Sequence, residues 1–207
     1  MPTASQPALY TIGHSNQSAE EFIKLLQKFQ IEVLVDVRSA PYSRWAPHFS
    51  KETLSDILTS HGVRYLYLGQ ELGGRPDPVQ RPDLYDDDGH ALYYLMAQED
   101  LFLAGLQRLS KGLRRFRLAI MCSEEDPTHC HRRLLVGKTM IERENVELSH
   151  IRRDGATELE SEVTLPGQPQ AIQQSLFNHA EELQEVNPWR STQSVLPRSQ
   201  QRSFSNS

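Results

Sequence analysis

Cysteine is scarce in this chain, and long apolar runs are missing from it. The 207 residues include two cysteines, Cys122 and Cys130, which are too few for the disulfide framework of a small secreted domain. No stretch approaches the roughly 20 apolar residues that span a bilayer. The opening segment MPTASQPALYTIGHS also lacks the basic start and apolar run of a signal peptide. We therefore expect a cytoplasmic protein with reduced thiols and no part in a membrane.

An excess of positive charge is missing as well. Lys and Arg number 22 against 27 Asp and Glu, which gives a formal net charge of −5. Such a chain has no overall positive field to attract nucleic acid or an anionic membrane. The sequence also contains no Walker motif and no G-x-G-x-x-G, the fingerprints of nucleoside triphosphatases and dinucleotide-binding proteins. Any anion site must therefore be local.

The composition changes near residue 155. Residues 156–207 carry six Glu and three Arg and are rich in Gln, Ser and Pro, which predicts a largely disordered tail. Within it, residues 171–186 have the pattern of an amphipathic helix with a face for docking on the core or on a partner protein. The length and the 38% of hydrophobic residues suffice for one core, so we predict one α/β domain over residues 8–155.

Strand and helix patterns alternate regularly in this domain. Apolar runs of strand length alternate with segments of helical period, one of which begins with a capping box formed by Ser18 and Glu21. The order βαβαβαβαβ predicts three layers: a mainly parallel five-stranded sheet with helices on both faces. The alternative is an α+β layout with one antiparallel edge strand. The predicted strands cover residues 8–15, 32–39, 63–69, 116–122 and 146–151, and the predicted helices cover residues 18–30, 50–62, 91–112 and 131–145.

Polar residues gather where the predicted strands end. In a doubly wound sheet, ligands bind beyond the carboxyl ends of the strands. We therefore expect the side chains that follow the strands to line one continuous pocket. These residues are His14 and Ser15 after the first strand, Asp36, Arg38 and Ser39 after the second, Glu71, Gly73, Gly74 and Arg75 after the third, and Cys122 and Glu124 after the fourth.

The motifs at these strand ends resemble those of a known family. YTIGHSN, LVDVRSAPYSR, LGQELGG, MCSEEDPTHCHR and HIRRDG, in this order, are similar to the DUF488 family of bacterial and archaeal proteins. The resemblance covers roughly residues 8–160 and leaves the tail outside it. It implies a compact α/β domain with a shared pocket and supplies no reaction.

The two thiols allow three interpretations. Cys130 is predicted at a helix start near Arg132, where the helix dipole and the guanidinium would lower the pKa of a nucleophilic or redox-active thiol. Cys122, which closes a buried strand, could instead be a small core residue. A zinc site with three protein ligands and a water is the third interpretation, although C-x7-C-H is not the spacing of a zinc finger or ribbon. Its candidate ligands are Cys122, His129, Cys130, His131 and, from the first strand, His14.

Arginines from four predicted loops or helix starts point to an anionic ligand. Guanidinium groups hold phosphate or carboxylate in two-point geometry. Arg38 could alternatively pair with Asp36 or Glu71. His14 suits an acid–base role, with Asp36 orienting it or holding a cation. The four arginines are Arg38, Arg44, Arg75 and Arg132.

These features predict an enzyme that transfers or hydrolyses a phosphorylated or other anionic substrate, such as a nucleotide or a nucleic-acid end. The alternative is a non-catalytic ligand- or nucleic-acid-binding module that recruits a partner through its tail. We expect His14, Asp36 and Cys130 to be catalytic. The expected substrate-binding residues are Ser15, Arg38, Ser39, Arg44, Glu71, Gly73, Gly74, Arg75, Cys122, Glu124, His131 and Arg132.

Overall fold

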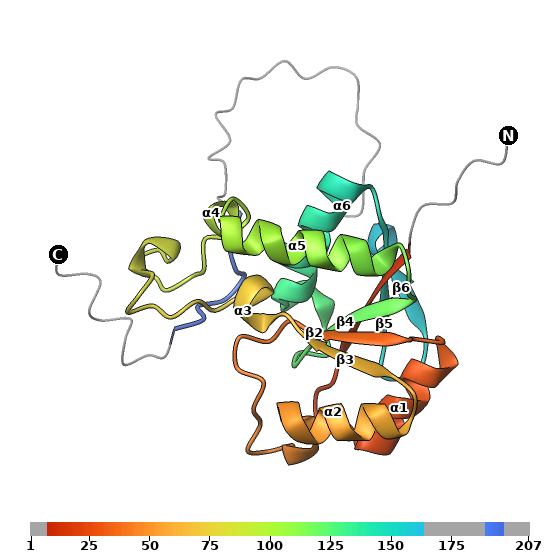
Figure 1. Cartoon of the computed structure of the whole chain (residues 1–207). Helices are drawn as coiled ribbons and strands as arrows, with labels where there is room; N and C mark the ends of the chain where they lie inside the picture. The colour runs from red at the N-terminus through yellow and green to blue at the C-terminus, as the bar shows by residue number, and fades with distance from the viewer. Residues whose placement is uncertain (1–7, 164–188, 197–207) are drawn as a thin grey trace, which may run out of the picture.

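The computed structural model describes residues 8–163 and 189–196, which form a mixed six-stranded sheet between two layers of helices (Figure 1). The strand order is β3-β2-β4-β1-β5-β6. The helix predicted over residues 171–186 lies outside the described residues. Within the described ranges, no helix combines the length and the apolar character needed to cross a membrane.

The sheet confirms the predicted α/β class and its mainly parallel character. The pairs β1–β4, β1–β5, β2–β3 and β2–β4 are parallel, and β6 pairs antiparallel with β5. The carboxyl ends of the parallel strands therefore lie at one edge of the sheet. The strands are β1 (Ala8–Gly13), β2 (Val33–Asp36), β3 (Arg64–Tyr67), β4 (Leu118–Cys122), β5 (Glu147–Ile151) and β6 (Thr157–Leu159).

The prediction of five strands was wrong, because β6 adds an antiparallel edge strand. Gly155 has φ of +80° and reverses the chain between β5 and β6, a conformation that glycine adopts at little cost. Three residues are too few to show a strand period in the sequence. The antiparallel edge strand of the alternative layout is thus present, but within an α/β architecture.

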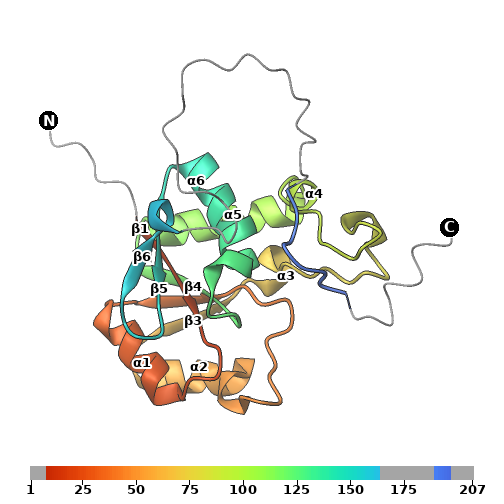
Figure 2. The same cartoon turned by 180° about the vertical axis from the view of Figure 1, so that it is seen from behind.

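The helices cover the two faces of the sheet (Figures 1 and 2). On one face lie α1 (Ala19–Lys28) and α2 (Lys51–Ser60), and on the other lie α5 (Asp100–Leu113) and α6 (Lys138–Glu144), with the short α3 (Gly69–Leu72) and α4 (Tyr93–Met96) near α5. The predicted capping box of α1 is confirmed by hydrogen bonds of 3.1 and 3.2 Å between Ser18 and Glu21.

The single helix predicted over residues 91–112 was wrong, because the chain leaves the helical conformation before α5. Glu99 is extended, with φ −66° and ψ 135°, and precedes the first turn of α5. Its carboxylate forms an ion pair of 2.8 Å with Arg81 from the preceding loop. The apolar period continues across the break, so the sequence pattern alone does not reveal it.

Alternating residues of the strands divide the core into two. Val35 and Ile120 face the α5 side, whereas Leu34 and Met121 face α1 and α2. This alternation follows from the period of two in a strand. Burial on both faces explains why these strands read as continuous apolar runs.

Part of the predicted tail belongs to the folded unit. Besides β6, residues 189–196 pack beside α4: Ser191 donates its backbone N–H to the Ala91 carbonyl at 2.9 Å. The indole of Trp189 donates to the Leu134 carbonyl at 2.6 Å, and Leu196 is buried. We call residues 189–196 the returning segment.

Candidate functional site

The loop that follows β4 is fixed to the end of β1. His14 and Ser15 donate their backbone N–H groups to the carbonyls of Cys122 and Ser123, at 3.0 and 2.8 Å. A Cβ atom on Gly13 would lie 1.8 Å from the Glu124 carbonyl oxygen, so only glycine fits there. The first strand and the cysteine loop therefore meet at backbone contact distance.

Arg132 holds the same loop from inside the protein. Its side chain is fully buried and donates to the carbonyl oxygens of Glu124 and Glu125, the latter at 2.6 Å. It also donates to the hydroxyl of Thr11 at 3.3 Å. Arg132 was expected to bind substrate, but its guanidinium is engaged with backbone oxygens and does not line the cavity described next.

A cavity of about 470 Å³ lies at the carboxyl ends of β2 and β4. Seven of the predicted binding residues line it, and the returning segment supplies one wall. The predicted members are Arg38, Ser39, Gly74, Arg75, Cys122, Glu124 and His131; the others are Ala40, Asp77, Tyr93, Ser123, His129, Ser191, Gln193, Ser194 and Val195.

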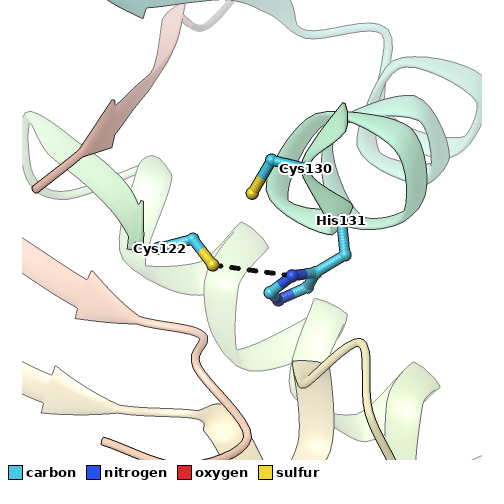
Figure 3. A group of neighbouring side chains, drawn as sticks. All are labelled: Cys122, Cys130 and His131. Atoms are coloured by element: carbon cyan, nitrogen blue, oxygen red, sulfur yellow. Dashed lines mark hydrogen bonds between the residues drawn. The ribbon is translucent and has the colours of Figure 1, made fainter. Parts of the chain in front are cut away.

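Two thiols and an imidazole converge at the base of this cavity. We call Cys122, Cys130 and His131 the thiol–imidazole cluster. Their potential ligand atoms all lie within 4.8 Å of one another, and Cys122 Sγ is 3.6 Å from His131 Nδ1. Figure 3 shows the two sulfur atoms and the ring turned toward one another from the end of β4 and the start of a helix. Cys122 lines the cavity and Cys130, only 1% exposed, does not, which differs from the expectation that Cys130 acts on the substrate.

The backbone sets the orientation of the His131 ring. Nε2 lies 2.9 Å from the Val37 carbonyl oxygen, which can only accept a hydrogen bond. In the neutral imidazole, Nε2 therefore carries the proton and the Nδ1 lone pair faces Cys122. His131 thus presents a base or a metal ligand to the cluster.

Glu124 lies beside both thiols. Its Oε2 is 2.9 Å from Cys122 Sγ and 3.3 Å from Cys130 Sγ. The hydrogen bond with Cys130, together with burial, raises the pKa of Cys122. Burial also acts to raise the pKa of Cys130, but the hydrogen bond with Cys122 and the charge of Arg132 outweigh it and lower that pKa. Ionisation of the pair is thus favoured at Cys130.

His14, Asp36 and Arg38 form a buried group of their own. Arg38 pairs with Asp36 at 2.6 Å and donates to the Phe49 carbonyl at 2.7 Å. Its Nη1 lies 3.1 Å from His14 Nε2, and His14 Nδ1 lies 2.8 Å from the Ser15 carbonyl. Burial first, and the charge of Arg38 second, lower the pKa of His14 to about 4.

These contacts change the expected roles of the group. Both ring nitrogens of His14 are engaged, and neither His14 nor Asp36 lines the cavity. Arg38 reaches the cavity wall, yet its guanidinium is paired with Asp36. This pairing is the alternative to anion binding that the sequence also allowed. The structure therefore does not bring His14, Asp36 and Cys122 into one cleft.

The remaining predicted residues lie elsewhere. Glu71 and Gly73 line a second cavity of about 280 Å³, which shares Ser39, Arg75 and Asp77 with the first, and Glu71 pairs with Arg108. Arg44 is exposed, and Ser15 lines neither cavity.

Sequence reasoning missed Tyr93, the Val37 carbonyl and the returning segment. Backbone carbonyls carry no sequence signal. The returning segment offered one: Trp189 stands in a polar stretch, and a tryptophan offers a large apolar ring for packing and an N–H for a hydrogen bond.

Fold and site together define an α/β protein with a thiol–imidazole cluster beneath a cavity at the carboxyl ends of its strands. The chain belongs to the family described as Domain of unknown function DUF488, whose model matches residues 18–138. That range contains the whole cluster. No curated protein and no solved structure matches the chain.

Proposed function

We propose that this protein is an enzyme that hydrolyses or transfers a group of a small anionic substrate bound in the 470 Å³ cavity, with the thiol–imidazole cluster as the reaction centre. The observation that carries the proposal is the position of the cluster: Cys122 and His131 form part of the cavity wall, with reactive atoms 3.6 Å apart. A purely structural cysteine would have no need of an oriented imidazole.

The size and the place of the cavity support this proposal. Sites for small molecules usually enclose about 300–1,000 Å³. The cavity also lies beyond the carboxyl ends of parallel strands, where α/β proteins bind their ligands. The proposed substrate is thus a compact molecule of nucleotide size or smaller.

Arg75 is the arginine best placed to bind an anionic group. Its side chain is 62% exposed, and its nearest carboxylate, Glu124, is 4.0 Å away, which is the distance of a weak pair. Its backbone N–H donates to the Ser39 hydroxyl at 3.0 Å, which fixes the backbone at the cavity wall. A phosphate or carboxylate of the substrate would compete with Glu124 for this guanidinium.

The test is a panel of phosphate esters and nucleotides offered to the full chain. We expect turnover of at least one of them, a loss of kcat in His131→Ala, and a rise in KM of about tenfold or more in Arg75→Ala, since a charge-assisted contact is worth about 1.5–3 kcal/mol. Arg44→Ala, an exposed arginine outside the cavity, is the matched control and should leave both constants unchanged.

Absence of turnover across the panel, with binding retained, would contradict an enzyme and favour the binding module. One observation supports that second candidate: Tyr42 and Trp45 flank Arg44 and are 70% and 96% exposed. Exposed aromatic rings beside a cation suit stacking with single-stranded nucleic acid. Binding of an oligonucleotide that Trp45→Ala abolishes and Arg75→Ala does not would establish it.

The tail as a recruiting segment for a partner protein belongs to this second candidate. Both candidates place the protein in the cytoplasm, where reducing conditions keep Cys122 and Cys130 as the free thiols that the structure contains.

A further inference from the structure

We infer that the thiol–imidazole cluster is a zinc site in which Cys122, Cys130 and His131 supply three ligands and the fourth position opens into the cavity. Zinc binding stands on the geometry alone, whereas a catalytic role for the ion rests on the function proposed above.

The distances match tetrahedral zinc. With Zn–S of about 2.3 Å and Zn–N of about 2.0–2.1 Å, tetrahedral geometry requires about 3.6 Å between sulfur and nitrogen ligands. Cys122 Sγ and His131 Nδ1 are 3.6 Å apart. All three ligand atoms lie within 4.8 Å of one another, so small side-chain movements suffice to close the remaining edges.

The surroundings of His131 are those of a metal ligand. A histidine that binds a metal through one ring nitrogen usually donates the other N–H to a carbonyl or carboxylate, which fixes its tautomer. The Val37 carbonyl accepts from Nε2 in this way and leaves Nδ1 for the ion.

The spacing C-x7-C-H is not that of a zinc finger or ribbon, and adjacent residues such as Cys130 and His131 rarely bind one ion. The backbone resolves this difficulty. Cys130 is extended, with φ −109° and ψ 135°, whereas His131 is helical, with φ −60° and ψ −24°, and precedes the π-helical segment η4 (Arg132–Gly137). This change of conformation lets both side chains turn to the same point, as Figure 3 shows.

Charge and ligand type also fit zinc. Two thiolates and a neutral imidazole balance the +2 charge of the ion, so the buried site becomes neutral when both thiol protons leave to solvent. Soft sulfur ligands with an imidazole in tetrahedral geometry select zinc over magnesium or calcium. In hydrolysis, such an ion supplies a Lewis acid and activates a water at the open position. Glu124, whose Oε2 is next to both sulfurs, is placed to accept a hydrogen bond from that water.

The experiment measures metal rather than turnover. The full chain, purified without chelators, is analysed by mass spectrometry of its metals, and we expect about one zinc per chain. The variants Cys122→Ala, Cys130→Ala and His131→Ala should each retain at least about tenfold less zinc than the wild type. His129→Ala, a cavity histidine outside the cluster, is the matched control and should keep its zinc.

Cobalt substitution covers the case in which a variant fails to fold. In the wild-type chain, Co²⁺ should give the absorption of a tetrahedral ion with sulfur-to-metal charge transfer. Reduced wild-type protein that retains no zinc and gives no such spectrum would overturn the inference. Turnover that survives chelation also would overturn a catalytic role for zinc, while bound zinc without turnover would leave the site standing and remove the proposed function.

Discussion

The carboxylate of Asp36 is shielded from solvent, and neighbouring side chains donate hydrogen bonds to it. It is fully buried and accepts from Arg38 at 2.6 Å and from the hydroxyl of Tyr65 at 2.7 Å. A buried charge is tolerated only when it is paired and hydrogen-bonded. Arg38 and Asp36 are therefore one structural unit, which fixes the end of β2 beneath the cavity.

His14 provides a prediction at the scale of one residue. Its lowered pKa of about 4 means that the unfolded state, with the ordinary value of 6.5, binds a proton that the folded state refuses. Stability is therefore fully present above about pH 6.5 and falls as the pH drops toward about 4. When the pH is lowered from about 7 to about 5, the free energy of unfolding should fall by about 2 kcal/mol more in the wild type than in His14→Gln. Urea unfolding at the two pH values measures this difference.

The groups facing His14 are Arg38, Asp36, His48 and the stacked ring of Phe49. These groups remain in His14→Gln, so the difference between the two proteins reports the contribution of the His14 imidazole to the pH dependence of stability. Equal pH dependence of the two proteins would show that folding does not change the pKa of His14 and would contradict the prediction.

At this scale the sequence predicted the residues of the site better than their roles. The strand-end rule brought six of the expected binding residues to one cavity, because parallel strands end at the same edge, and His131 joins them from the helix start that follows the cysteine loop. It could not separate His14 and Asp36 from that cavity, since burial decides which polar side chains pair with each other and which face a ligand.

The contact between β1 and the cysteine loop is the feature that matters most among the elements. A Cβ on Gly13 would meet a backbone oxygen, which cannot rotate away as a side chain can. Gly13→Ala should therefore lower the free energy of unfolding by about 3 kcal/mol, the upper range for overpacking.

Gly112→Ala is the matched control, because its Cβ would meet only the flexible end of Leu118 at 3.2 Å. Chemical denaturation of the two variants measures the difference. A Gly13→Ala protein as stable as the wild type would mean that the loop moves freely away from β1.

Helices and strands were predictable where a local signal marks their ends. The Ser18–Glu21 capping box placed the start of α1, and apolar runs placed the five parallel strands. The break before α5 and the strand β6 were not predictable, since no glycine or proline marks the break in the sequence and the strand depends on pairing with β5.

At the scale of the whole molecule, the returning segment brings residues from the C-terminal part of the sequence to the cavity wall. It contacts Ala91 through a backbone hydrogen bond and Tyr93 through the ring of Trp189. It also supplies Ser191 and Val195 to the cavity wall. Stability and access to the thiol–imidazole cluster are therefore linked through residues far apart in the sequence.

Two shortened chains test this link. A chain ending at residue 163 loses the returning segment, whereas a chain ending at residue 196 keeps it. We expect the shorter chain to lose about 2–4 kcal/mol of unfolding free energy through exposed apolar surface. Its Cys122 should also react faster with iodoacetamide in the presence of a chelator. Identical stability and labelling of the two chains would show that the segment contributes nothing to the folded unit.

Arg132 gives the cysteine loop a property that concerns its capacity to change. Because the guanidinium grips carbonyl oxygens, which every residue possesses, the path of the loop does not depend on which side chains it carries. Replacements at Ser123 or Glu124 would alter the chemistry of the cavity while the loop keeps its shape. The protein thus separates scaffold from reactivity at these positions, and this makes the loop a natural starting point for directed evolution of new activities.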